Sequence, residues 1–121
     1  MIETKKSSLA ARVVVPAIER VTAALQADPD LWAKSVIVHM LSGGGIDVSA
    51  HEHPWDDVHA MAELLDVSAE PVSAFPLQDS DRLSVRFGES RHNGGIELIW
   101  YVPVPTAVLA LGPSLTALLG E

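Results

Sequence analysis

Two glycine-marked chain reversals, each set between apolar-rich segments, constrain the fold more than any other feature of this sequence. One is a Ser-Gly-Gly-Gly run at 42–45, and the other is a His-Asn-Gly-Gly run at 92–95. Glycine and Asn-Gly pairs readily supply the positive φ angles that tight hairpin turns require. The sequence therefore predicts two β-hairpins, SVIVHML with IDVSAHEH and DRLSVRFGESR with IELIWYVPV.

The side-chain pattern selects the register of the first hairpin. A three-residue loop at Gly43–Gly45 makes one face wholly apolar, because alternate residues of paired strands share a face. That face carries Val36, Val38, Met40, Ile46, Val48 and Ala50. The opposite face is mixed and carries Ile37, His39, Leu41, Asp47, Ser49 and His51.

The second hairpin has a strong type I′ turn signal at Asn93-Gly94. A turn there pairs Val85 with Val102 and Phe87 with Trp100. The resulting apolar face carries Leu83, Val85, Phe87, Ile96, Leu98, Trp100 and Val102. The other face carries Ser84, Arg86, Glu97, Ile99 and Tyr101.

Between the hairpins, HPWDDVHAMAELLD has the periodicity of an amphipathic helix. Pro54 suits its first position, and its buried stripe is Trp55, Val58, Met61/Ala62 and Leu65. Two further helices are expected, over 8–27 with Pro16 inside the pattern, and over 106–119 with a break at Gly112-Pro113. The stretch 67–81, which contains two prolines, reads as a connecting loop that crosses an edge of the sheet.

These elements predict a single two-layer α+β domain over residues 1–121, with 1–7 disordered. The expected order is α-β-β-α-β-β-α, and the helices pack on a mainly antiparallel four-stranded sheet. No export signal or membrane-length apolar segment is visible, which favours a cytoplasmic protein that does not enter a membrane.

Charge and cysteine content exclude several functions. The chain has a formal net charge of -8, so repulsion from a phosphate backbone disfavours nucleic-acid binding. It contains no cysteine, which removes disulfides, thiolate metal sites and a nucleophilic thiol. No phosphate loop, nucleophile elbow or oxyanion-hole sequence is present, and an enzymatic function is unsupported.

Three histidines form the one group of candidate metal ligands. An HxH pair places His51 and His53 on one face of a strand, and the first hairpin places His39 diagonally opposite His51. Imidazoles with a nearby carboxylate would suit Zn²⁺ or another divalent transition metal. The competing interpretation, which we favour, is a surface strand with polar histidines and no cofactor, because HxH pairs are common.

The outward sheet face is the candidate interaction surface, through Ile37, Leu41, Arg86, Ile99 and Tyr101. A sheet face that carries apolar side chains needs a cover. The first and third helices of the same chain are one cover, and a second subunit or a protein partner is the other.

The leading functional hypothesis is a non-enzymatic interaction or accessory protein, including a homo-oligomer. Alanine-rich, lysine-poor and asparagine-poor usage is typical of small proteins of high-GC bacteria and their phages. This likeness assigns no site residues and no activity, and a phage or mobile-element factor that binds a host protein is one form of the interaction hypothesis. The alternatives are a histidine-based metal-binding protein and an acidic mimic of nucleic acid.

Overall fold

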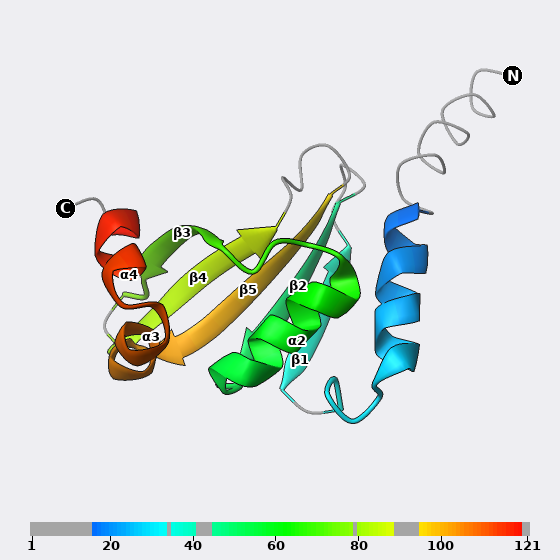
Figure 1. The fold of residues 1–121 in the computed structure, drawn as a ribbon, viewed down its shortest axis with the longest axis horizontal. Coiled ribbons are helices and arrows are strands. Elements are labelled where there is room, and N and C mark those ends of the chain that lie inside the picture. The colour runs from blue at the N-terminus through cyan, green and yellow to red at the C-terminus, as the bar shows by residue number, and fades with distance from the viewer. Residues whose placement is uncertain (1–15, 34, 41–44, 79, 89–94, 120–121) are drawn as a thin grey trace, which may run out of the picture.

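A five-stranded mixed sheet organises the chain, and the helices pack against it (Figure 1). The structure is a computed structural model that describes residues 16–33, 35–40, 45–78, 80–88 and 95–119. A helix over 16–27 comes first in the described chain. The remaining elements are β1 (Val36–Met40), β2 (Ile46–His51), α2 (Trp55–Leu65), β3 (Pro71–Pro76), β4 (Arg82–Gly88), β5 (Ile96–Pro103), α3 (Val104–Leu111) and α4 (Pro113–Leu118).

The strand order is β1-β2-β5-β4-β3, with β2 and β5 parallel and the other pairs antiparallel. The predicted α+β class and mainly antiparallel sheet are confirmed, but the prediction of four strands is wrong. The fifth strand is β3, which lies within the stretch 67–81 that was expected to be a loop. Pro71 and Pro76 bound this strand, and an edge strand tolerates proline because one side of its backbone has no strand to bond.

The first hairpin has the predicted faces but pairs two residues away from the predicted register, because a three-residue loop at Gly43–Gly45 would place Val38 opposite Ala50 and Met40 opposite Val48. Val38 pairs with Val48 and Met40 pairs with Ile46, so their side chains share one face. Residues 41–44, at the predicted glycine turn, lie outside the described residues.

The second hairpin pairs two residues away from the predicted register. Val85 lies opposite Trp100 and Phe87 lies opposite Leu98, whereas an Asn93-Gly94 turn would require Val102 and Trp100. A shift of two residues keeps every side chain on its expected face, because side chains alternate with a period of two. Residues 89–94, which include the predicted turn, lie outside the described residues.

The helix α2 buries its predicted stripe against the sheet. Val58, Met61, Ala62 and Leu65 are at most 1% exposed. Trp55, at the start of the helix, contacts two core rings, with centroid distances of 5.4 Å to Trp100 and 5.7 Å to Phe87. Burial of this stripe attaches α2 to the face predicted to be apolar.

The terminal helices complete the same core. Ala17, Val21 and Ala24 of helix 16–27 are buried in one cluster with α2 and the apolar sheet face, as are Ala107 of α3 and Leu115 of α4. The expected break at Gly112 separates α3 from α4. The alternative in which the terminal helices cover the outward sheet face is therefore wrong for the described residues. Expectations for 1–15 lie outside them.

A side chain at Gly88 should destabilise the fold. Gly88 has φ +97°, and a Cβ there would lie 2.7 Å from the Ile96 carbonyl oxygen and 3.2 Å from the Val67 Cβ. We expect Gly88→Ala to lower the free energy of unfolding by about 3 kcal/mol in urea titrations.

The matched control is Gly112→Ala. Gly112 also has a positive φ, +55°, but a Cβ there meets nothing within 4 Å. Only the backbone strain remains, at about 1 kcal/mol. Equal losses for the two variants would contradict the steric explanation for Gly88.

Candidate functional site

One side of the sheet carries no described helix, and we call it the helix-free face. Along each strand, its side chains alternate with those that point toward the helices. None of them belongs to the core cluster beneath the helices. The face consists of Ile37, His39, Asp47, Ser49, His51, Ser73, Phe75, Arg82, Ser84, Arg86, Glu97, Ile99 and Tyr101.

An ion pair occupies the centre of the helix-free face. Arg86 Nη1 on β4 donates to Glu97 Oε1 on β5 at 2.7 Å, and the two side chains are only 26% and 16% exposed. The Arg86 guanidinium also lies 5.9 Å from the centre of the Phe75 ring on β3. This contact is within the range of a cation–π interaction. One side chain therefore links three neighbouring strands on this face.

A pair of stacked rings is a second ordered contact on the helix-free face. His51 on β2 and Tyr101 on β5 are directly paired in the parallel register, and their ring centroids are 4.7 Å apart at 16°. Arg82 Nη2 bonds Glu52 Oε2 at 2.8 Å at the same end of the sheet. Aromatic and charged groups thus form an ordered polar surface rather than a continuous apolar patch.

The predicted interaction residues differ in how accessible they are. Ile37 is 57% exposed, whereas Ile99 is only 3% exposed and lies beneath the neighbouring side chains of the face. Arg86 and Tyr101 are partly buried in the contacts described above. Leu41 lies outside the described residues. Phe75, which sequence reasoning assigned to a loop, is 55% exposed and is the large aromatic side chain most open to a partner on this face.

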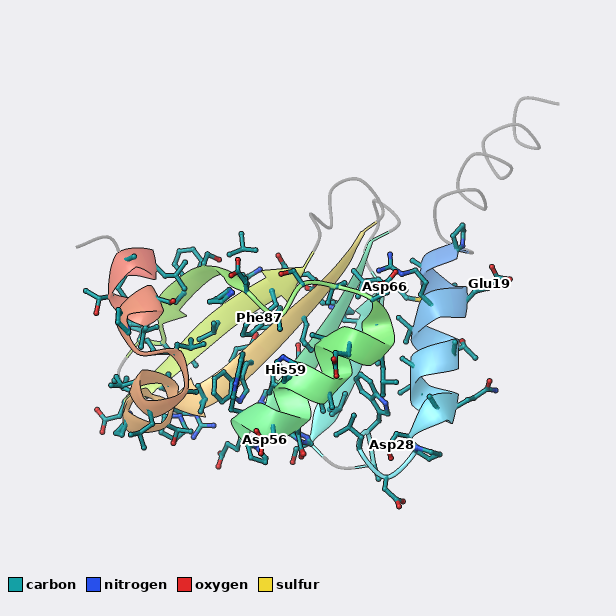
Figure 2. The ribbon with its side chains drawn as sticks, viewed as in Figure 1. Glu19, Asp28, Asp56, His59, Asp66 and Phe87 are labelled. Atoms are coloured by element: carbon teal, nitrogen blue, oxygen red, sulfur yellow. The ribbon has the colours of Figure 1, made fainter. Side chains whose placement is uncertain are left out.

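Charge is divided unequally between the two sides of the sheet. At the helix-free face, Arg86 is paired with Glu97 and Arg82 with Glu52, and Asp47 adds one further carboxylate. Exposed carboxylates gather on the helix-bearing side, where Figure 2 shows Glu19, Asp28, Asp56 and Asp66. The chain has a formal net charge of -8. The helix-free face is therefore close to neutral in a strongly acidic protein.

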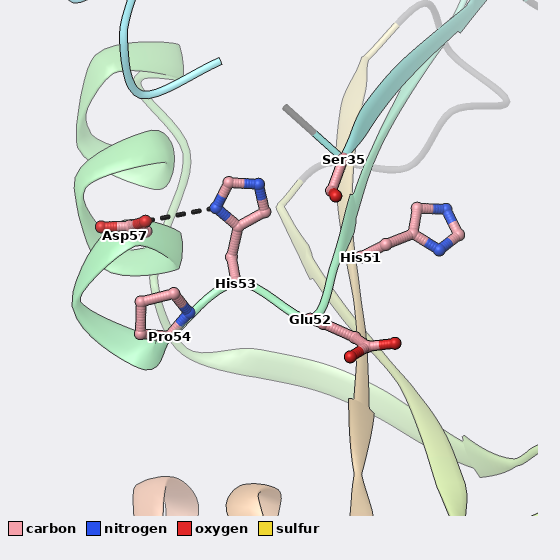
Figure 3. Close-up of a pocket in the computed structure, with 6 residues that line it drawn as sticks. All are labelled: Ser35, His51, Glu52, His53, Pro54 and Asp57. Carbon is pink, nitrogen blue, oxygen red and sulfur yellow. Dashed lines mark hydrogen bonds and ion pairs between the residues drawn. The ribbon is translucent and has the colours of Figure 1, made fainter. Parts of the chain in front are cut away.

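A polar pocket of about 510 Å³ lies where β2 ends and α2 begins (Figure 3). It is lined by Ser35, His51, Glu52, His53, Pro54 and Asp57. Ser35 and Glu52 both have positive φ, 56° and 60°. These left-handed residues lie at the start of β1 and the end of β2, where the chain changes direction.

His53 connects the sheet to α2. It is 5% exposed, and its Nδ1 lies 3.2 Å from Asp57 Oδ2, one helical turn away. Its backbone carbonyl accepts a hydrogen bond of 2.8 Å from the buried Trp100 Nε1. These contacts support a structural role for His53. Sequence reasoning missed this contact, although the spacing of His53 and Asp57 is the i, i+4 spacing of helical pairs.

The predicted metal ligands do not converge. Asp47, not His51, lies opposite His39, and four residues along β2 separate Asp47 from His51, about 13 Å at the usual rise. His51 and His53 point to opposite sides of the chain in Figure 3, because the positive φ of Glu52 ends the strand alternation. The expected diagonal and shared-face arrangements are therefore wrong. No group of three or more His, Cys, Asp or Glu that could hold a metal ion occurs within the described ranges.

Comparisons of this chain with protein-family models, with curated proteins and with solved structures found no match. No helix among the described residues is long and apolar enough to cross a membrane. The function is therefore inferred from the residues and geometry of this chain.

The ion pair at the centre of the helix-free face should be energetically coupled. We expect a double-mutant cycle of Arg86→Met and Glu97→Gln, followed by urea unfolding, to give a coupling of about 1–2 kcal/mol, because partial burial reduces solvent screening.

The exposed pair on α2 provides the comparison for this cycle. His59 Nδ1 and Glu63 Oε1 are 3.9 Å apart, and their side chains are 50% and 72% exposed. A cycle at that pair should give at most about 0.5 kcal/mol. A coupling at Arg86 and Glu97 no larger than this would show that the central pair is fully screened.

Proposed function

We propose that this protein is a non-enzymatic protein-binding protein whose helix-free face contacts another polypeptide. The observation that carries the proposal is the one-sided packing of the described helices: α2, α3, α4 and helix 16–27 all bury side chains in one cluster. The opposite side keeps exposed apolar groups, among them Phe75 at 55%. An exposed aromatic side chain beside an arginine on an ordered sheet favours contact with a partner.

The chemistry of the face supports a polypeptide as the partner. Protein interfaces are enriched in aromatic residues and arginine, and their hot spots include Tyr and Arg. Here Tyr101, Phe75 and Arg86 lie on three adjacent strands. Arg86 contacts Phe75 and Glu97, and Tyr101 stacks on His51. These contacts already restrict the side chains, so binding would cost less conformational entropy.

An accessory protein encoded by a phage or mobile element and directed at a host protein would fit this proposal. Its surface would need to recognise another protein without catalysis. The polar groups of the pocket favour a structural role over a reactive one, since Asp57 contacts His53, Glu52 contacts Arg82, and His51 stacks on Tyr101. An acidic helix-bearing side would also help to keep such a protein soluble.

The proposal predicts that aromatic truncation on the helix-free face abolishes partner capture. The immobilised double variant that carries Phe75→Ala and Tyr101→Ala should capture at least about tenfold less of the partner than the unmodified protein does, from a lysate of the source organism. The partner is identified by mass spectrometry from the unmodified protein.

Leu109→Ala is the matched control, because Leu109 is an apolar residue on α3 that is 88% exposed and lies away from the face. It should leave capture unchanged. Circular dichroism confirms that each variant is folded. Capture that does not depend on Phe75 and Tyr101, or that falls equally with Leu109→Ala, would rule out the helix-free face as the binding surface.

A further inference from the structure

The two edges of the sheet differ sharply in how they are protected. β3 begins and ends with Pro71 and Pro76, and its register against β4 shifts between Pro71 and Ser73. Prolines and bulges are the usual means of preventing an edge strand from pairing with another chain. β1 has neither a proline nor a register shift, and its sequence VIVHM has no Lys, Arg, Asp or Glu.

The side chains of β1 are exposed on both sides of the sheet. Ile37, on the helix-free face, is 57% exposed. Val38 and Met40 point to the helix-bearing side, yet they are 42% and 55% exposed. The described helices therefore leave the helix-bearing side of β1 incompletely covered. A regular edge strand that has this exposure and carries no Lys, Arg, Asp or Glu is a preferred site for pairing with a further strand.

The backbone geometry shows which groups of β1 are available. The His51 N–H donates to the Ser35 carbonyl at 2.8 Å. Antiparallel pairs alternate between hydrogen-bonded and non-hydrogen-bonded, so Ile37 and His39 also bond across to β2. The N–H and C=O groups of Val36, Val38 and Met40 therefore point away from β2, toward the open edge.

We propose that β1 pairs antiparallel with β1 of a second copy of this chain. The fullest overlap of β1 places Val38 opposite Val38 of the second copy and Val36 opposite Met40. In that register all three outward-pointing residues form hydrogen-bonded pairs. The proposal goes beyond the proposed function, because it concerns the edge of the sheet at β1 and not the side chains of the helix-free face.

The distribution of charge and helices supports a second copy as the occupant. Two chains with a formal net charge of -8 repel one another. Pairing through β1 joins them at a strand that carries no Lys, Arg, Asp or Glu, and the antiparallel register places Val36, Val38 and Met40 opposite only apolar side chains of the second copy. Arg20 of helix 16–27 bonds the carbonyls of Leu65 and Asp66, and in Figure 1 this helix extends past β1 on the side of α2. A strand added beside β1 would therefore lie next to this helix.

The contact area sets the expected strength of the dimer. Two five-residue strands bury less surface than the roughly 1,600 Å² of a standard protein interface. We therefore expect a concentration-dependent dimer. Sedimentation of the purified chain between about 1 µM and 500 µM should show the mass rising from 12.9 kDa toward twice that value.

Substitutions at Val38 test the register directly. Val38→Lys and Val38→Glu should each weaken self-association at least about tenfold, because like charges would meet at the symmetry axis. Mixing the two variants should restore a dimer to within about tenfold of the wild-type affinity. Val72→Lys is the matched control on the protected β3 edge, where Val72 is 65% exposed, and it should leave the dimer unchanged.

Each outcome decides the proposal. A wild-type monomer throughout the series, or a dimer that Val38→Lys leaves intact, would overturn it. Two monomeric variants that fail to associate when mixed would overturn the pairing of Val38 with Val38. If circular dichroism shows either Val38 variant to be unfolded, Met40→Lys at the same edge is the substitute and should weaken the dimer. The assay contains no other protein, so its failure would leave the capture experiment with Phe75 and Tyr101 unaffected.

Discussion

The parallel pairing of β2 with β5 is the constraint on which the other features of this protein depend. It aligns the two strands residue by residue, so Val48 lies beside Leu98 and Ala50 beside Trp100, each fully buried. The same alignment places His51 beside Tyr101 on the opposite side. Because side chains alternate, the choice of one apolar face for the helices fixes the composition of the other. The helix-free face therefore follows directly from the packing of the core.

Local patterns in the sequence were sufficient to predict much of this arrangement. The apolar stripe of α2 and the faces of the described strand residues depend on periodicity within short segments. The register of each hairpin differs by two residues from the prediction, because a shift of two leaves that periodicity unchanged. The fifth strand was missed because Pro71 and Pro76 indicate a loop unless the strand is known to lie at an edge. The parallel contact between β2 and β5 joins segments far apart in the chain, and hairpin signals carry no information about it.

The candidate site was less predictable, because it depends on how the chain leaves a strand. An HxH pattern implies a shared face only while the strand continues. Glu52, at φ 60°, ends that alternation, so His53 turns toward α2 and Asp57 while His51 remains on the sheet. Ile99 shows a related effect, since its position on the outward face was predicted correctly but the surrounding side chains leave it only 3% exposed.

Charge and edge protection together indicate where another polypeptide can approach. Carboxylates on the helix-bearing side favour repulsion between copies of the chain. The prolines of β3 prevent a further strand from pairing at that edge of the sheet. The surface that remains is formed by β1 and the adjoining helix-free face. Both consist of ordinary strand residues, so a binding role for them requires no strained or catalytic group.

Residue-resolved amide hydrogen exchange over a dilution series tests the central claim most directly, that the open side of the sheet at β1 is where this chain meets another polypeptide. The amides of Val36, Val38 and Met40 point to the open edge, while those of Ile37 and His39 bond to β2. The account predicts that exchange of the outward amides slows as protein concentration rises, while that of the inward amides stays slow throughout. Fast exchange of the outward amides at every concentration would contradict it.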